Sequence, residues 1–116
     1  MTKDEFQVTN SNLKEVLKTE ENMYFKDKEE RNFYFAHKID PTPYLFTNFY
    51  HEYFYVIFQI DDYAIYYNDI EEDFGVCKIE SDQCDLNTEF CDANLAPTVR
   101  RFKKALEEDA METLFA

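Results

Sequence analysis

The sequence contains one glycine, Gly75, and no tryptophan among its 116 residues. Glycine-rich loops bind phosphates by bringing several backbone N–H groups close to the ligand, so a single glycine excludes such a loop. Most tight turns must instead use asparagine and aspartate, which tolerate left-handed backbone geometry.

Basic residues are nearly absent from one continuous third of the chain. Residues 52–92 carry a single base, Lys78, and twelve acids, giving −11 of the total net charge of −13. The acids are Glu52, Asp61, Asp62, Asp69, Glu71, Glu72, Asp73, Glu80, Asp82, Asp85, Glu89 and Asp92. Nucleic-acid-binding proteins neutralise phosphates with lysine and arginine, so this charge argues against a direct nucleic-acid ligand and favours a basic protein partner.

Long apolar segments and an even set of cysteines are also missing. The longest apolar run, Tyr53–Phe58, is far shorter than the ~20 residues of a membrane span, and the polar start "MTKDEFQVTN" does not resemble a leader peptide. The three cysteines, Cys77, Cys84 and Cys91, show no sign of an oxidising compartment. We therefore expect no membrane partner, and reduced thiols in a cytoplasmic protein.

Aromatic residues are abundant. Phenylalanine and tyrosine together number 21, against 18 leucine, isoleucine and valine residues. The nine tyrosines favour half-exposed surfaces and interfaces, because each hydroxyl needs water or a partner. The length fits a single domain over residues 1–116 that builds a core without metal or disulfide bonds.

The two ends of this domain have helical patterns. Asn12 followed by Glu15 predicts a helix start, with an apolar stripe continuing to about Glu21. A second helix is predicted to begin near Asn94–Pro97, and its apolar face is formed by Val99, Phe102, Leu106, Ala110 and Leu114. Its early turns are basic and its later turns acidic, opposite to the helix dipole, so we expect acids elsewhere in the fold to neutralise the basic turns.

Between these helices the pattern predicts strands at about 22–26, 31–39, 44–50, 53–60, 63–69 and 74–80, joined by short turns. Short connections favour antiparallel neighbours. The expected fold class is therefore α+β: an antiparallel β-meander of about five strands, with an N-terminal and a C-terminal helix packed on it. Residues 80–94 have no clean period and are expected to form an acidic loop.

The stretch "YFYVIFQIDDYAIYY", residues 53–67, predicts a hairpin that turns at Asp61–Asp62. This register places Phe54, Val56, Phe58, Ile60, Ile65 and Tyr67 on one face, under a helix. The other face then carries Tyr53, Tyr55, Ile57, Gln59, Ala64, Tyr66, Asn68 and Ile70. A longer turn would exchange the two faces.

Catalytic and metal-binding patterns are weak. His37 and His51 lie in no nucleophile motif, and the seven-residue spacing of the cysteines matches no zinc signature. The segment Asp69–Glu80 resembles a calcium loop, but it has Phe74 where an EF-hand needs glycine, and strands are expected on both sides. Paired carboxylates can act as catalytic acid and base inside a cleft, but no pattern in this sequence indicates such a cleft. We expect no enzyme and no cofactor.

The acids remain as a candidate binding surface. They are interleaved with tyrosine, a preferred interface anchor, and carboxylates can take the positions of phosphates by accepting bidentate hydrogen bonds from arginine. The alternative is a solvated acidic face that only keeps the protein soluble. The predicted partner-binding residues are Asp61, Asp62, Tyr66, Asp69, Glu71, Glu72, Asp73, Tyr53 and Tyr55.

The aromatic pair "YFYVIFQIDDYAIYY" followed by "NDIEEDFG" in a short acidic chain resembles the small immunity proteins of bacterial polymorphic toxin and contact-dependent growth inhibition systems. The resemblance implies a cytoplasmic antitoxin that blocks a basic toxin, typically a nuclease, at its active site or an adjacent exosite. Two alternatives remain open. One is a phage-type nucleic-acid mimic that inhibits a host restriction or CRISPR enzyme, and the other is a non-catalytic adaptor subunit.

Overall fold

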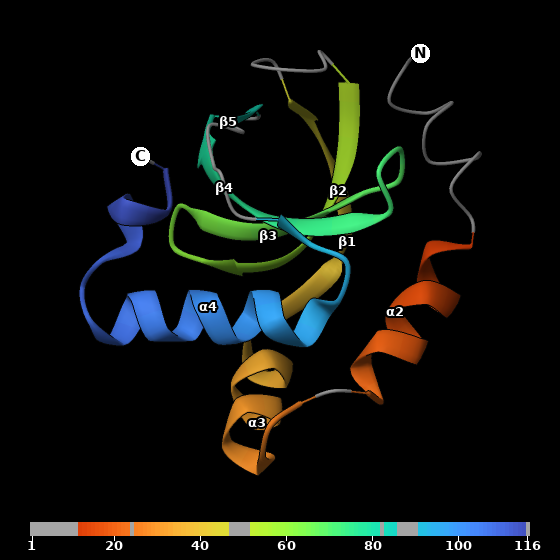
Figure 1. The fold of residues 1–116 in the computed structure, drawn as a ribbon. Coiled ribbons are helices and arrows are strands. Elements are labelled where there is room, and N and C mark those ends of the chain that lie inside the picture. The colour runs from red at the N-terminus through yellow and green to blue at the C-terminus, as the bar shows by residue number, and fades with distance from the viewer. Residues whose placement is uncertain (1–11, 24, 47–51, 82, 86–90, 116) are drawn as a thin grey trace.

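The computed structural model describes residues 12–23, 25–46, 52–81, 83–85 and 91–115 (Figure 1). Two helices, α2 (Leu13–Glu21) and α3 (Lys28–His37), precede the strands, and α4 (Leu95–Glu107) with the short 3-10 helix η1 (Met111–Phe115) follows them. The strands are β1 (Lys38–Phe46), β2 (Glu52–Ile60), β3 (Tyr63–Asn68), β4 (Asp73–Glu80), β5 (Gln83–Asp85) and β6 (Cys91–Asp92). The α+β class with helices at both ends is confirmed.

The strands form a closed barrel. From β1 to β5, each strand pairs antiparallel with the next, as the predicted meander requires. The barrel closes because β5 also lies parallel to β1, at Leu45–Gln83 and Phe46–Cys84. Strand β6 adds to β4 at Phe74–Asp92 and Gly75–Cys91. The loop expected over 80–94 therefore includes two short strands, and its residues 82 and 86–90 lie outside the described part of the chain.

The strand predicted over residues 31–39 is wrong, because most of it forms helix α3. Asp27 caps this helix by accepting the Glu30 N–H at 2.9 Å, and the Glu30 carboxylate accepts the Lys26 N–H at 3.1 Å. Phe33 and Tyr34 lie one turn before His37, and the ring centres of all three lie 5.6–6.0 Å from the ring centre of Phe58. These aromatic residues thus belong to a helix rather than to a strand. The strand predicted at 22–26 is absent from its described residues, 22–23 and 25–26.

The predicted hairpin register is correct near the turn and changes further away. Ile60 pairs with Tyr63 and Phe58 with Ile65, around the two-residue turn Asp61–Asp62. Beyond them a β-bulge leaves Ile57 as an extra residue, so that Val56 pairs with Tyr66 instead of Tyr67. The bulge exchanges the two faces of β2 on its N-terminal side.

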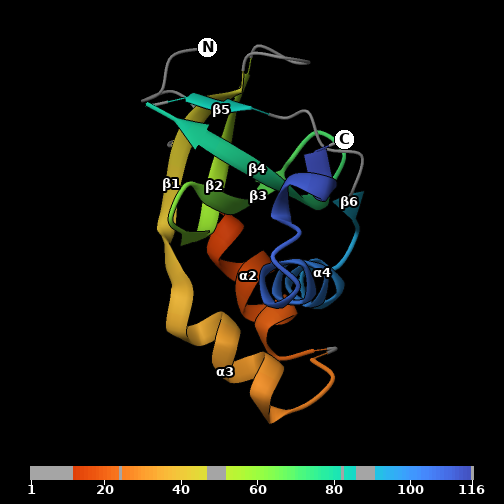
Figure 2. The ribbon, with the colours of Figure 1, turned by 90° about the vertical axis from the view of Figure 1, so that its left-hand side faces the viewer.

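Two apolar clusters result from this arrangement. One consists of strand residues and fills the barrel: Phe46, Phe54, Val56, Ala64, Tyr66, Cys77 and Ile79, with Ile39 and Tyr44 at its border. The other lies between the barrel and the helices and includes Tyr55, Ile57, Phe58, Ile65, Phe74 and Val76 from the strands. Figure 2 shows the barrel above the helices, with α3 at the opposite end of the molecule.

Only part of the predicted apolar face of the C-terminal helix packs on the second cluster. Val99 and Phe102 are fully buried, whereas Leu106 is 37% exposed. The helix ends at Glu107, and Leu114 is buried from η1 instead. Each helix in the described part of the chain falls short of the length and apolar character needed to cross a membrane.

Candidate partner-binding surface

The predicted acidic residues fall in two separate turns. Asp61 and Asp62 form the β2–β3 turn, and Asp69, Glu71 and Glu72 lie in the β3–β4 turn, all of them exposed. Strand β3 separates the turns with six residues, about 20 Å at ~3.3 Å per residue. Figure 1 shows the β2–β3 turn on the side of η1 and the β3–β4 turn on the side of α2. One continuous surface therefore does not include all the predicted acids.

The β3–β4 turn is the centre of a carboxylate cluster. Asp73 follows it in β4, and the electrostatic neighbours of Asp69 and Asp73 include acids that are distant in sequence. We call the cluster the acidic end and define it by Glu52, Asp69, Glu71, Glu72, Asp73 and Asp92. Glu52 contributes from the start of β2, and Asp92 comes from β6, opposite Phe74.

Asn68 fixes the shape of the β3–β4 turn. Its side chain is 3% exposed, and its Oδ1 accepts the N–H groups of Ile70 at 2.9 Å and Glu71 at 3.1 Å. Glu72 completes the reversal with a positive φ of 54°. Asparagine side chains that bond backbone two or three residues ahead build such turns. The acids are consequently displayed on a preorganised loop.

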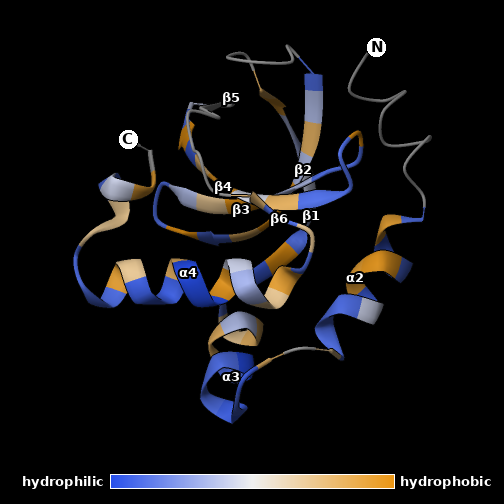
Figure 3. Ribbon diagram, in the orientation of Figure 1, coloured by the Kyte–Doolittle hydropathy of each residue, from blue (hydrophilic) through white to orange (hydrophobic). Residues whose placement is uncertain are grey.

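An aliphatic side chain occupies the tip of this turn. Ile70 is 53% exposed, the largest exposure among the large hydrophobic residues in the described part of the chain. Figure 3 shows a hydrophobic stretch at the tip of this otherwise hydrophilic turn. Isolated exposed apolar residues are common, but this one is surrounded by Asp69, Glu71 and Glu72. The turn therefore combines one apolar contact with several negative charges.

The carboxylates of the acidic end are crowded. Burial raises the pKa of Asp73, and the charges of Glu71 and Asp92 raise it further. Burial and the charge of Glu52 likewise raise the pKa of Asp69, against an opposing backbone hydrogen bond. The Oδ1 atom of Asp73 is buried and has no hydrogen-bond partner among the described residues. Ionisation of Asp69 and Asp73 is thus less favourable in the folded protein than for a fully solvated carboxyl group.

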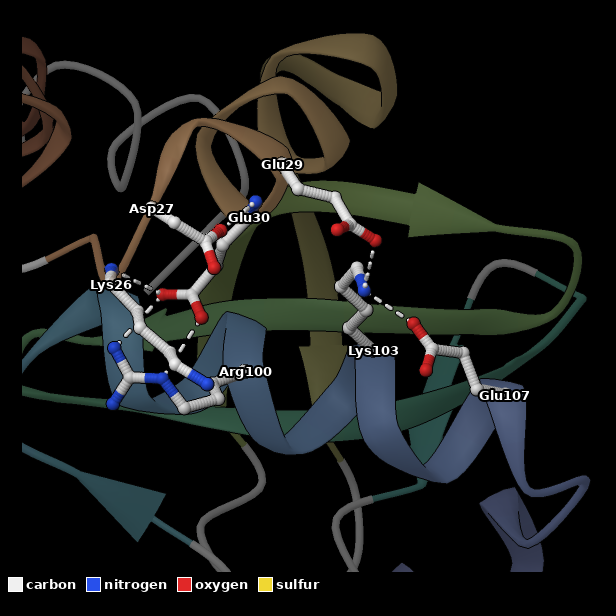
Figure 4. Close-up of polar contacts among 7 residues, drawn as sticks. All are labelled: Lys26, Asp27, Glu29, Glu30, Arg100, Lys103 and Glu107. Carbon is white, nitrogen blue, oxygen red and sulfur yellow. Dashed lines mark hydrogen bonds and ion pairs between the residues drawn. The ribbon is translucent and has the colours of Figure 1, made fainter.

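Charges in the helical layer are arranged in the opposite way. Arg100 binds both carboxylate oxygens of Glu30, with its Nε and one terminal nitrogen each at 2.9 Å. Lys103 pairs with Glu29 at 3.1 Å and with Glu107 on its own helix. Figure 4 shows these acids of α3 facing the bases of α4. The expectation that acids elsewhere neutralise the basic turns of α4 is confirmed for Arg100 and Lys103, whose ion-pair partners outside α4 come from α3, and Asp92 of the acidic end adds a longer-range attraction to Arg100.

The tyrosine part of the predicted surface requires correction. Tyr55 and Tyr66 are 7% and 2% exposed, so neither presents its ring to a partner. The bulge at Ile57 turns Tyr55 toward the helices, and Tyr66 lies inside the barrel across from Gly75. A Cβ atom on residue 75 would lie only 2.6–2.7 Å from the Tyr66 ring, so this glycine provides the space for it. Tyr53 is half-buried in β2.

Sequence reasoning missed several residues of the acidic end. Asn68 and Ile70 were assigned to a sheet face, although an asparagine before "DIEED" is itself a turn signal. Glu52 and Asp92 come from distant segments, and no local pattern indicates that they join the cluster. The calcium-like segment Asp69–Glu80 forms a turn and a strand, without the helices that flank an EF-hand loop.

Comparisons with known proteins returned no matching family model, no matching curated protein and no matching solved structure.

Proposed function

We propose that this chain is a cytoplasmic immunity protein that neutralises a basic toxin of the nuclease type. The acidic end would bind the cationic surface that the toxin uses for its nucleic-acid substrate. The observation that carries the proposal is the contrast in charge pairing: the α4 bases pair with α3 acids, and the acidic end retains crowded carboxylates.

The chemistry of the acidic end suits a phosphate-binding partner. Exposed carboxylates accept charge-assisted hydrogen bonds from arginine and lysine, as phosphate oxygens do. A cation from the partner would also relieve the repulsion that raises the pKa of Asp69 and Asp73. The negative field would increase the association rate by roughly 10–10³-fold at low salt.

The rigidity and the apolar tip of the turn support the same role. Asn68 holds the backbone of Ile70 and Glu71, so little ordering entropy is lost on binding. Ile70 can enter an apolar site on the partner while Asp69, Glu71 and Glu72 contact cations around it. This arrangement suits either the toxin active site or an adjacent exosite.

The proposal is tested with the product of the adjacent open reading frame, expressed as its C-terminal basic domain. The variant Glu71→Lys should weaken binding at least tenfold, about 1.4 kcal/mol, and should fail to rescue growth of cells that produce the toxin. The matched control is Glu80→Lys, an equal charge change at an exposed position at the other end of β4. It should bind within about twofold of the parent.

A third variant, Asp62→Lys, tests whether the β2–β3 turn also takes part in binding, as the sequence predicts. Loss of affinity with Glu71→Lys and not with Glu80→Lys would support the acidic end. If all three variants bind the basic domain with equal affinity, measured calorimetrically at about 0.05 M salt, the role of the acidic end is refuted. Binding to a restriction or CRISPR enzyme, with no binding to the adjacent gene product, would favour the nucleic-acid mimic instead.

A further inference from the structure

A surface hollow lies between α2 and α3, at the end of the molecule opposite the barrel (Figures 1 and 2). It has a volume of about 260 Å³ and is lined by Asn22, Met23, Phe25, Asp27, Lys28 and Arg31. The connection between the two helices shapes it, since Arg31 donates to the Glu21 carbonyl at 3.0 Å. The hollow is thus formed by the α2–α3 connection and the first turns of α3, and it belongs to neither the barrel nor the acidic end.

Two cations, Lys28 and Arg31, border this hollow. Within the described part of the chain, neither Lys28 nor Arg31 forms an ion pair. The lining therefore carries two cations, Lys28 and Arg31, and one acid, Asp27, in a protein whose net charge is −13. Asp27, the one acid of the lining, uses its Oδ1 to cap α3. The lining of the hollow therefore has a net positive charge, although the whole molecule is acidic.

Exposed apolar side chains accompany these cations. Met23, in the lining, is 39% exposed, and Phe35, one turn beyond Arg31, is 40% exposed. The Arg31 guanidinium lies over the Phe35 ring, 4.8 Å from its centre, and connects the hollow to that ring. An occupant matched to this surface needs an aliphatic side chain flanked by carboxylates.

The β3–β4 turn of the same sequence has this composition. It presents Ile70 between Asp69 and Glu71, and Asn68 already holds it in a fixed shape. The turn and the hollow lie on different parts of one molecule (Figure 1), so a contact between them joins two molecules. We infer that the α2–α3 hollow binds the β3–β4 turn of a second copy of this chain.

Such a contact is heterologous, because the hollow of one copy meets a different surface of the next. Net charge of −13 opposes association, but salt screens charges more than ~8 Å apart at 0.15 M and leaves direct contacts largely intact. The inference goes beyond the proposed function and does not depend on it. If both hold, self-association covers the acidic end, and a partner must displace the second copy.

Sedimentation equilibrium at about 0.15 M salt, from about 10 µM to about 1 mM protein, tests the inference. The unmodified chain should show a mass that rises with concentration. Arg31→Glu and Glu71→Arg should each weaken association at least tenfold. The double variant Arg31→Glu/Glu71→Arg, whose net charge is again −13, should recover it.

The matched control is Glu80→Arg, which has the same net charge of −11 as Glu71→Arg. Reduced repulsion alone would strengthen association in both, whereas the proposed contact predicts weakening only for Glu71→Arg. Far-UV circular dichroism verifies that each variant is folded. A monomeric parent over the whole range, equal effects of Glu71→Arg and Glu80→Arg, or no recovery in the double variant would each overturn the inference.

Discussion

The helical layer and the acidic end of the barrel differ in how their charged side chains are paired. In the helical layer, Glu30 is 4% exposed and is bound by Arg100 through two hydrogen bonds. At the acidic end, the turn carboxylates are exposed, and Asp73 keeps a buried oxygen without a partner among the described residues. The difference indicates that the paired charges hold the fold together, whereas the unpaired charges lower its stability and are available to another molecule.

The largest expected effect is a loss of stability when one partner of an ion pair in the helical layer is removed. Glu30→Ala removes the Arg100 partner and the carboxylate that accepts the Lys26 N–H. Loss of a buried partner costs 3–5 kcal/mol, and because Arg100 is partly exposed we expect about 2–3 kcal/mol. Chemical denaturation measures the change. The control Glu29→Gln, at the exposed neighbouring pair, should behave like the parent; an equally unstable control would show that Glu30 has no special role.

A second substitution tests the barrel wall next to the acidic end. Gly75→Ala places a methyl group against the buried Tyr66 ring, and such overpacking costs about 1–3 kcal/mol. The additional variant Tyr66→Leu should create room, so that Gly75→Ala costs less in that background. Equal costs in both backgrounds, measured by thermal unfolding, would mean that the ring does not limit residue 75.

A third substitution removes the preorganisation of the turn. Asn68→Ala deletes the acceptor for the Ile70 and Glu71 N–H groups and should cost about 1–2 kcal/mol. Amide hydrogen exchange at these two positions should accelerate, while exchange in α4 should change only by the global loss of stability. Unchanged exchange at Ile70 and Glu71 would show that Asn68 does not hold the turn.

The smallest effect is a pH dependence. Because the folded-state pKa of Asp73 is raised above its ordinary 3.8, the folded protein binds this proton more tightly than the unfolded chain does. Its contribution to the free energy of unfolding is therefore complete at acid pH and is lost as pH rises through the raised pKa. Asp73→Asn should gain stability relative to the parent as pH rises from about 3 to 7. A gap that is constant with pH would contradict this assignment.

Sequence patterns predicted the parts of the fold that local geometry decides. The Asp61–Asp62 turn and its first two residue pairs follow from hairpin geometry, and the ends of the chain have clear helical periods. The bulge at Ile57 depends on packing between two clusters, so residue spacing did not indicate that Tyr55 would be buried. Helix α3 was missed because its aromatic residues outweighed the cap formed by Asp27 and Glu30.

The candidate site was predictable to a similar extent. Acids adjacent in sequence, from Asp69 to Asp73, do lie together, whereas Asp61 and Asp62 lie at the other end of β3. Glu52 and Asp92 join the acidic end through strand pairing, at the start of β2 and in β6. Burial of Tyr66 follows from closure of the barrel, a tertiary event that residue spacing does not encode.

The central claim is that the charge of the acidic end does not serve the fold. The most direct test is the free energy of unfolding of Glu71→Gln/Glu72→Gln, measured by chemical denaturation at pH 7 in about 0.05 M salt. Relief of repulsion predicts that the variant is as stable as the parent or more stable, by about 0.5 kcal/mol. A loss of more than about 1 kcal/mol would mean that these carboxylates stabilise the folded chain itself, and would contradict the account.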